Sequence, residues 1–334
     1  MVKRKVILRA DGNAKIGYGH VMRLLALFDC ISESFNCLFL LSEKNDAIEK
    51  HINKQGCKYE VMPPCKTAKD EVSFMAEKHV APNDIVVLDG YHFDTTYQKL
   101  MKAICNKLVR IDDVPNMHHY ADVIVNHAGN VVKSNYSAEL YTQFYLGTAY
   151  ALVRNAFYEK AKNDVFEIDL EKDNNVFISM GGADPTNELF NVLDKIALTN
   201  ENYNYQILIG GAYQHAALLQ TKLKKMRCNY VIHKNLNLEE IVSLMTACKI
   251  AIVTPSTIAY EYLHIGGILF LQQTAQNQKN ILSYLIKEAL ALPFNKGFKL
   301  PETDTIKTML QKQKAVFNGE AKLNYLNLFK SLKA

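Results

Sequence analysis

One histidine, His20, lies in a sequence context that could make it a catalytic base. It follows a short apolar run, Val6–Ile7–Leu8, and a loop that contains Gly17 and Gly19. Glycines let a backbone approach a ligand closely, and the apolar positions after His20 predict a helix that begins there. The positive end of a helix dipole disfavours the imidazolium form, so a neutral, proton-accepting histidine is expected.

Two other interpretations of this loop stay open. Gly17-x-Gly19 resembles part of a dinucleotide-binding fingerprint, and Glu43 follows the next apolar run, where a ribose-binding acid would be expected. Met22 occupies the third glycine position, however, and the loop is longer than the tight turn of that fingerprint. A histidine at the start of a helix can also be purely structural.

Two strand ends in the second half of the chain carry residues suited to phosphate binding. Gly181 and Gly182 follow the apolar run Val176–Met180, and their amides can face an anion at a helix start. Ser256 and Thr257 follow another apolar run, and either can cap the next helix while its amides and hydroxyl hold phosphate oxygens. A plain strand-to-helix turn remains an alternative at both places.

Sugar recognition is indicated by the polar residues nearby. Glu261 falls about one helical turn after Thr257, where a carboxylate could accept hydrogen bonds from two ribose hydroxyls. The amide-rich stretch Leu271–Gln278 follows a buried strand, and uncharged amides suit hydroxyl or acetamido groups. Together the three polar strand ends predict a nucleotide-sugar site.

The elements that position these residues are short apolar strands alternating with helices. This alternation predicts an α/β fold with two Rossmann-like parallel-sheet domains facing a cleft, because ligands bind beyond the carboxyl ends of parallel strands. The expected strands are Lys5–Arg9, Cys37–Leu41, Tyr59–Met62, Ile85–Asp89, Lys107–Ile111, Val123–Val125, Val176–Met180, Tyr205–Ile209, Tyr230–His233, Ile250–Val253 and Ile268–Leu271.

The expected domains are residues 1–160, with the catalytic base, and 175–300, with the nucleotide site. The charged stretch Tyr158–Asn175 is the expected junction. Residues 301–334 contain two amphipathic stretches, Thr305–Ala315 and Leu323–Leu332, which we expect to be helices that pack back toward the first domain.

Composition excludes several classes of protein. The 334 residues are 49% hydrophobic and 22% charged, with a net charge of +5, which is typical of an ordinary globular protein. The densest basic run, Lys222–Arg227, lacks interleaved aromatics, so no nucleic-acid partner is expected. The longest apolar runs have the length of strands, so no membrane span is expected.

The seven cysteines are scattered and include no Cys-x-x-Cys pair, and no signal peptide is recognised. We therefore expect reduced core cysteines and a cytoplasmic location. The cluster Asp112, Asp113, His118, His119, Asp122 and His127 could in principle ligate a metal, but it lacks a compact ligand spacing. We expect neither a metal nor an organic cofactor.

With these residues in view, the chain resembles the nucleotide-sugar hydrolases of pseudaminic acid biosynthesis and the related spore-coat polysaccharide proteins. It also resembles, more broadly, the two-domain glycosyltransferases of the B type. The matching segments are Arg9–Ala10–Asp11, Ile16–Gly17–Tyr18–Gly19–His20, Leu88–Asp89–Gly90–Tyr91, Ile111–Asp112–Asp113, Tyr150–Ala151–Leu152–Val153–Arg154 with Phe157, Met180–Gly181–Gly182–Ala183–Asp184, Ser256–Thr257 with Glu261, and Asn277–Gln278.

The resemblance implies the release of UDP from a UDP-linked diacetamido-trideoxy hexose, by water attack at the anomeric carbon with inversion and without a metal. It implies that His20 activates water and that Glu261 binds ribose. Tyr91 and Asn277 would position the sugar, and Asp11 and Arg154 would organise the cleft. The residues implied to bind the nucleotide-sugar also include Gly17, Gly19, Gly181, Gly182, Ser256, Thr257 and Gln278.

Other functions fit the same residues. A glycosyltransferase would use the same donor with an acceptor hydroxyl in place of water. A hydrolysing 2-epimerase would change the configuration at carbon 2, and a non-catalytic subunit would bind UDP without turnover. The stereochemistry of the sugar and the oligomeric state do not follow from the sequence.

Overall fold

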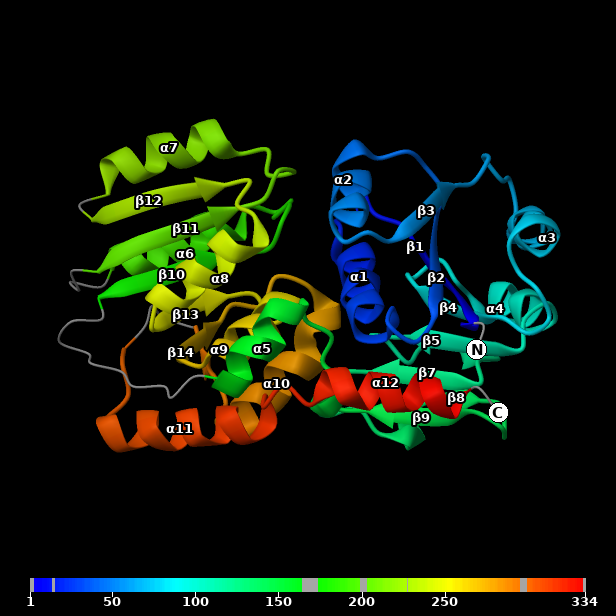
Figure 1. Cartoon of the computed structure of the whole chain (residues 1–334). Helices are drawn as coiled ribbons and strands as arrows, with labels where there is room; N and C mark the ends of the chain where they lie inside the picture. The colour runs from blue at the N-terminus through cyan, green and yellow to red at the C-terminus, as the bar shows by residue number, and fades with distance from the viewer. Residues whose placement is uncertain are drawn as a thin grey trace. The chain divides into compact units, whose positions relative to one another are not determined.

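The chain folds into two compact units, each built on a parallel sheet covered by helices (Figure 1). The first unit comprises Met1–Asn155 and Ala321–Ala334, and the second comprises Ala156–Glu320. The computed structural model describes residues 3–13, 16–163, 174–198, 203–226, 228–294 and 299–332.

The first unit contains a seven-stranded sheet with the strand order β3-β2-β1-β4-β5-β7-β9. Every neighbouring pair in it is parallel. The strands are β1 (Lys5–Ala10), β2 (Asn36–Leu41), β3 (Lys58–Val61), β4 (Ile85–Asp89), β5 (Lys107–Ile111), β7 (Val123–Asn126) and β9 (Gln143–Leu146), with a small separate pair, β6 (His118–His119) and β8 (Ser137–Ala138).

Helices cover both faces of this sheet. On one face, sheet residues such as Val86 and Leu88 share a buried core with Met75 and Met101 of two neighbouring helices. On the other face, Phe35 packs edge-on against Phe329, with ring centroids 5.9 Å apart. The helices are α1 (Gly19–Ile31), α2 (Asp46–Lys54), α3 (Ala68–Lys78), α4 (Thr95–Lys102) and α12 (Ala321–Ser331), with the 3₁₀ turns η1 (Lys133–Asn135) and η2 (Thr148–Tyr150).

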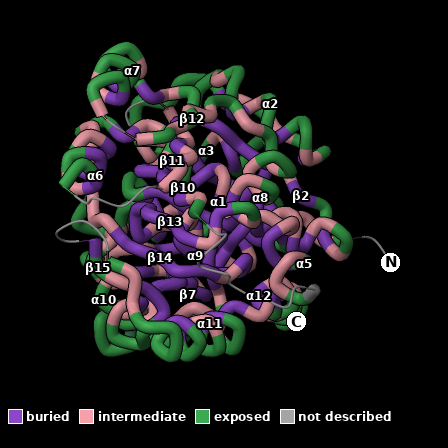
Figure 2. The backbone as a smooth tube through the Cα atoms, turned by 90° about the vertical axis from the view of Figure 1, so that its left-hand side faces the viewer, coloured by how far each residue is buried: buried purple, intermediate pink, exposed green. Residues whose placement is uncertain are grey.

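The second unit repeats the same design with six parallel strands in the order β12-β11-β10-β13-β14-β15. Its strands are β10 (Asn175–Ser179), β11 (Asn204–Ile209), β12 (Asn229–Lys234), β13 (Ile250–Val253), β14 (Ile268–Leu271) and β15 (Leu292–Pro293). Its helices are α5 (Asn155–Asn163), α6 (Glu188–Ala197), α7 (Ala216–Lys225), α8 (Leu238–Ala247), α9 (Thr257–Ile265), α10 (Lys279–Lys287) and α11 (Thr303–Val316), with the 3₁₀ turn η3 (Gln276–Gln278). Central strands such as β13 and β14 are buried along their whole length (Figure 2).

The parallel sheets and alternating helices confirm the predicted α/β fold. Four strands, β4, β5, β13 and β14, have the bounds expected from the sequence, because each is short, mostly apolar and almost entirely buried. Two strands of the main sheets, β9 and β15, were not expected from the sequence. The first is a partly exposed edge strand and the second has only two residues, so neither has a strong hydrophobic pattern.

The two helices after residue 300 belong to different units. In the first unit α12 packs against α1, and the Tyr325 hydroxyl donates a hydrogen bond to the Tyr150 carbonyl at 2.8 Å. In the second unit α11 packs against α9 and β14. Of the expected junction, residues 164–173 lie outside the described residues.

The cysteines form no disulfide, and five of the seven are buried: Cys30, Cys37, Cys57, Cys105 and Cys248. Burial raises the pKa of Cys37, Cys57, Cys105 and Cys248 to about 12, so these thiols are protonated and unreactive at neutral pH. Among the residues that the structure describes, no helix has the length and apolar character needed to cross a bilayer.

Each sheet reverses its strand order next to its first strand. In the first unit β2 and β3 lie on one side of β1, and β4 and β5 lie on the other. In the second unit the equivalent reversal falls between β10 and β13. Ligands of open α/β sheets bind beyond the carboxyl ends of strands at this switch point. The loops after β1, β4, β10 and β13 are therefore the places to look for a site.

We predict that Gln313 is a key stabilising residue of the second unit. It is buried, donates hydrogen bonds to the carbonyls of Gly267 and Leu290 at 2.9 and 2.8 Å, and accepts one from the Gly267 amide at 3.1 Å. Gln313→Ala leaves these groups unsatisfied and is expected to cost about 2–4 kcal/mol of unfolding free energy. Urea unfolding followed by circular dichroism measures this loss. The exposed Gln311→Ala is the matched control on the same helix, and equal midpoints for the two variants would contradict the prediction.

Candidate active site

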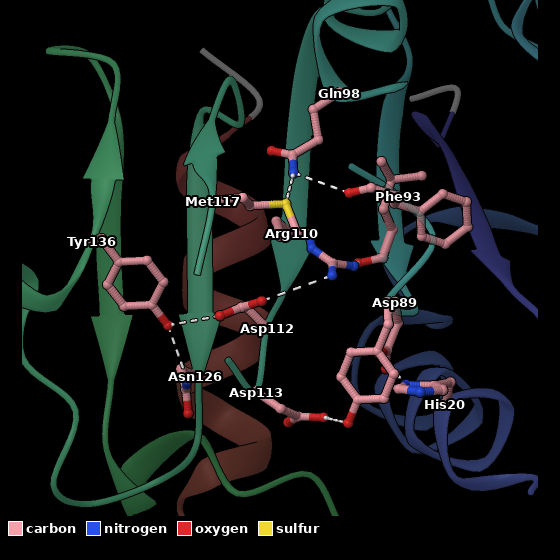
Figure 3. A network of polar contacts seen from close by, with 12 residues as sticks. His20, Asp89, Phe93, Gln98, Arg110, Asp112, Asp113, Met117, Asn126 and Tyr136 are labelled. Carbon is pink, nitrogen blue, oxygen red and sulfur yellow. Dashed lines mark hydrogen bonds and ion pairs between the residues drawn. The ribbon is translucent and has the colours of Figure 1, made fainter. Parts of the chain in front are cut away.

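His20 and Asp89 form a hydrogen-bonded pair at the switch point of the first unit. His20 is the second residue of α1, and Asp89 is the last residue of β4, in register with Ala10 at the end of β1. The Nδ1 atom of His20 lies 2.7 Å from Oδ1 of Asp89 (Figure 3). Among the described residues, no partner bonds the other ring nitrogen, Nε2. A carboxylate on Nδ1 fixes the tautomer in which Nε2 can accept a proton.

Arg23 holds Asp89 from the same helix as His20. One helical turn separates Arg23 from His20, so both side chains lie on one face of α1. The guanidinium donates to Asp89 twice, from Nε to Oδ2 at 2.7 Å and from Nη2 to Oδ1 at 2.6 Å. Asp89 is fully buried and Arg23 is buried, so this is a bidentate ion pair shielded from water.

Asp113 completes the arrangement from the loop after β5. Its two oxygens accept hydrogen bonds from Nη1 and Nη2 of Arg23, at 2.5 and 3.0 Å. The hydroxyl of Tyr91 donates to the same carboxylate at 3.2 Å, and the Tyr91 ring meets the His20 ring edge-on with centroids 4.9 Å apart. We call His20, Arg23, Asp89 and Asp113 the His20 cluster.

The charges of the His20 cluster stabilise one another. Burial opposes ionisation of Asp89 and Asp113, but the charge of Arg23 outweighs it, so the pKa of each carboxyl lies below its usual range. The two carboxylates likewise outweigh burial for Arg23 and raise its pKa well above the usual value. Next to the cluster, His127 lies 3.8 Å from Asp113, and burial, reinforced by Arg23, lowers the pKa of His127 to about 4. His127 is therefore neutral at physiological pH.

The acidic and histidine residues weighed as a metal site are held by separate partners. Asp112 lies 3.7 Å from the buried Arg110 and accepts a hydrogen bond from the Tyr136 hydroxyl (Figure 3). His118 bonds Ser137 and Glu139, and Asp122 pairs with Lys102. Within the described ranges no three histidine, cysteine or acidic side chains converge on a point that could hold an ion.

Two other expected site residues of the first unit have structural partners. Asp11 pairs with Arg9 at 2.6 Å, accepts the Ser42 amide at 2.8 Å and lies 3.3 Å from His92. It thus ties the end of β1 to the end of β2, and among the described residues no contact joins Asp11 to His20. Arg154 lies close enough to His51 to reinforce the effect of burial, which lowers the pKa of that histidine.

The loop before α1 is closed by its own backbone. Asn13 and Gly17 exchange hydrogen bonds of 3.2 and 2.8 Å between their main chains, with Gly17 at φ +76°. Glu43, weighed as a ribose ligand, instead accepts a hydrogen bond from the Asn13 side chain at 2.9 Å. Residues 14 and 15 of this loop lie outside the described residues.

In the second unit, the start of α9 is suited to an anion. Strand β13 ends at Val253, and α9 begins shortly after it. Ser256 is the residue just before the helix, and Thr257 is the first residue of the helix. Among the described residues, no side chain caps this helix and its first turn contains no acid. The amides of a helix N-terminus that lacks a side-chain cap attract phosphate oxygens.

The start of α6, by contrast, is already occupied by a carboxylate. Asp184 accepts hydrogen bonds from the amides of Glu188 and Leu189 at 2.8 and 3.0 Å. The glycine pair before it lies between β10 and this cap, with Gly181 at φ +91°. An anion near Gly181 and Gly182 would therefore meet the loop amides rather than the helix end.

The remaining expected residues lie on α9 and η3. Glu261 is buried one turn into α9, on the helix that Ser256 and Thr257 begin. Asn277 and Gln278 lie on η3 after β14. The Gln278 side chain accepts hydrogen bonds from the Thr274 and Ala275 amides at 2.8 and 3.2 Å, so it shapes its own loop.

From the sequence, no role was expected for Asp89 or Arg23, and Asp113 was weighed only as a possible metal ligand. Asp89 ends β4, Asp113 follows the neighbouring parallel strand β5 by two residues, and Arg23 follows His20 by three residues, so the signal was present. Gly210 was also missed: a Cβ there would lie 2.1 Å from the Gly182 carbonyl oxygen, which shows that only glycine fits beside this loop. No local motif marks that contact, because the two glycines are far apart in the sequence.

Comparison with known proteins supplies distant relatives, and no family model matches the chain. The chain is 26% identical over 300 residues to the UDP-2,4-diacetamido-2,4,6-trideoxy-beta-L-altropyranose hydrolase of Campylobacter jejuni, with 87% of this chain and 99% of that protein covered. It is 22% identical over 306 residues to the spore coat polysaccharide biosynthesis protein SpsG of Bacillus subtilis, with 90% and 86% covered. It is also 25% identical over 289 residues to the uncharacterized protein MJ1062 of Methanocaldococcus jannaschii, covering 85% of this chain but 58% of that protein.

Solved structures share the fold at low sequence identity. MurG of Acinetobacter baumannii matches with a TM-score of 0.63 and 10% identity, covering 98% of this chain and 99% of that one. A putative UDP-N-acetylglucosamine 2-epimerase of Listeria monocytogenes matches with a TM-score of 0.61 and 12% identity, covering 99% and 96%. The chain therefore has two Rossmann-like domains of the glycosyltransferase-B type.

We predict that Asp113 makes the stability of the first unit pH-dependent. Its lowered pKa means that the unfolded chain binds more protons at pH values between the folded pKa and about 3.9, so stability rises with pH through that window. Asp113→Asn should lose about 2–3 kcal/mol of unfolding free energy at pH 7, because the buried Arg23 loses one of its two carboxylate partners. The loss should shrink as the pH falls below 4.

Urea unfolding at pH 7 and pH 3 measures this difference. Asp304→Asn is the matched control, because its pair with Lys307 is exposed and should leave both midpoints unchanged. An Asp113→Asn variant whose deficit is the same at both pH values would contradict the prediction.

Proposed function

We propose that the protein is a nucleotide-sugar hydrolase that releases UDP from a UDP-linked diacetamido-trideoxy hexose. The observation that carries the proposal is the pairing of His20 with Asp89 at 2.7 Å, which leaves Nε2 of a switch-point histidine without a partner among the described residues. A carboxylate-oriented imidazole is a general base for water. The relative from Campylobacter jejuni, covered over 99% of its length, is named as a hydrolase of this sugar class and supports the choice of reaction.

In the proposed reaction, Nε2 of His20 takes a proton from a water molecule as its oxygen forms a bond to the anomeric carbon. The bond between that carbon and the diphosphate oxygen breaks, and UDP leaves with the electron pair. Attack opposite the leaving group inverts the anomeric configuration. The negative charge of Asp89 stabilises the imidazolium that forms, as the aspartate of a catalytic triad does.

The second unit is proposed to stabilise the leaving diphosphate without a metal. The N-terminus of α9 at Ser256 and Thr257 supplies amides and hydroxyls that lack a competing cap. The amides around Gly181 and Gly182 add further donors to the developing charge. Because Asp184 already caps α6, we assign the diphosphate to α9 and to the glycine loop rather than to the start of α6.

The sugar and the ribose are assigned to polar residues of both units. Glu261, one turn after Thr257, is proposed to bind the ribose hydroxyls. Tyr91, half exposed with its ring against His20, is proposed to position the hexose together with Asn277. We place Gly17 and Gly19 beside the sugar, and give Asp11, Arg154 and Gln278 the supporting role of shaping the loops that hold it.

We predict that His20→Asn lowers kcat by about 10²–10⁴-fold, because asparagine cannot accept the proton of water. UDP binding, measured by calorimetry, should remain within twofold of wild type, since the nucleotide is assigned to the second unit. His118→Asn is the control, because this histidine of the same unit bonds Ser137 and Glu139 and no member of the His20 cluster, and it should keep full turnover. Full turnover by a folded His20→Asn variant would rule out His20 as the base.

We predict that Glu261 recognises the ribose diol. Glu261→Gln should weaken UDP binding by about 10-fold or more, because a charged hydrogen bond to hydroxyls is lost from a buried site. The same substitution should weaken 2′-deoxy-UDP much less, since one partner hydroxyl is already missing. Equal losses for both nucleotides would show that Glu261 supports α9 without touching ribose.

A further inference from the structure

Arg23 lies between the two carboxylates of the His20 cluster and touches both in a bidentate manner. Four hydrogen bonds join its guanidinium to Asp89 and Asp113, at 2.5 to 3.0 Å. Its Nη2 atom also lies 3.4 Å from Nδ1 of His20. Arg23 thus contacts the imidazole and the carboxylate that orients it.

The formal charges of the cluster do not cancel. With one guanidinium and two carboxylates, Arg23, Asp89 and Asp113 sum to −1, and the lowered carboxyl pKa values keep both acids ionised at neutral pH. A neutral His20 leaves this charge in place, whereas a protonated His20 brings the cluster to zero. Because the group is enclosed, such charges interact more strongly than they would in water.

The groups packed around the cluster do not change this sum at neutral pH. From the loop after β7, His127 is neutral, and from α12 and the loop after β4, Tyr325 and Tyr91 are phenols. Beyond Asp113, the buried Arg110 and Asp112 sum to zero as a pair (Figure 3).

We propose that Arg23 is a positioning residue that sets the proton affinity of His20, cancelling one of two carboxylate charges so that the cluster becomes neutral when His20 takes up a proton. This inference rests on the proposed role of His20 as the base. With Arg23 removed, the remaining charge of −2 would hold His20 protonated at higher pH, where it cannot act as a base. With Asp113 removed, the remaining charge of zero would make His20 a weaker proton acceptor.

The test is to follow the protonation of His20 as a function of pH in four proteins: wild type, Arg23→Gln, Asp113→Asn and the double variant. Histidine ring signals followed by NMR give the titration midpoint of His20, with His20→Asn identifying the signal. Arg23→Gln is expected to move the midpoint up by about one pH unit or more, and Asp113→Asn to move it down by a similar amount. The double variant restores the sum of −1 and should return the midpoint toward that of wild type.

A purely structural role for Arg23 would not produce opposite shifts that cancel in the double variant. Arg23→Lys keeps the positive charge but loses the bidentate hydrogen bonds of the guanidinium. The titration midpoint of His20 should therefore stay at the wild-type value while kcat falls. Shifts of the same sign in Arg23→Gln and Asp113→Asn, or an unmoved midpoint in Arg23→Gln, would overturn the proposal.

The acid limb of the kcat/KM profile on the nucleotide-sugar separates this inference from the proposed function. If the limb moves with the NMR midpoint, Arg23 tunes the base of the reaction. If the NMR midpoints shift as expected but the limb does not follow them, the charge balance stands and the assignment of His20 as the base fails.

Discussion

The geometry around His20 depends on one buried guanidinium. Asp89 has no exposure to solvent, and without Arg23 its charge would be paired with His20 alone. Burying a carboxylate costs several kcal/mol unless it is paired and hydrogen-bonded, so the arrangement is stable only because Arg23 reaches both acids. The parallel register of β1, β4 and β5 brings the three chain segments to one sheet edge. Packing of apolar strands therefore fixes where the polar cluster forms.

The two units apply the same topology to different chemistry. In the first, the switch point carries a histidine oriented by a carboxylate, and an arginine neutralises one of the two acids beside it. In the second, the switch point carries the helix start at Ser256 and the glycine loop at Gly181, where backbone amides dominate. The difference between α6 and α9 is decided by one side chain, since Asp184 caps α6 while no described side chain caps α9. Of these two helix starts, that of α9 is therefore the one suited to an anion.

Much of this could be predicted from the sequence because its signals are local. Apolar runs marked the central strands, and the glycines before His20 marked its loop. The partners of His20 were not predicted, because the adjacency of Asp89 and Asp113 follows from strand order, which a single sequence does not display. The same holds for the contact between Gly210 and Gly182. The local pattern of apolar residues predicts individual strands and helices. A site formed by several of these elements can be predicted only when the order of the strands in the sheet is known.

We propose that His20 activates water for attack at the anomeric carbon of a UDP-sugar. The most direct measurement is turnover of UDP-2,4-diacetamido-2,4,6-trideoxy-β-L-altropyranose in ¹⁸O water without added metal, followed by NMR and mass spectrometry. We expect release of unlabelled UDP and a free sugar that carries ¹⁸O at its anomeric carbon with inverted configuration. Label in the phosphate of UDP, or release of UDP only when an acceptor sugar is present, would contradict it.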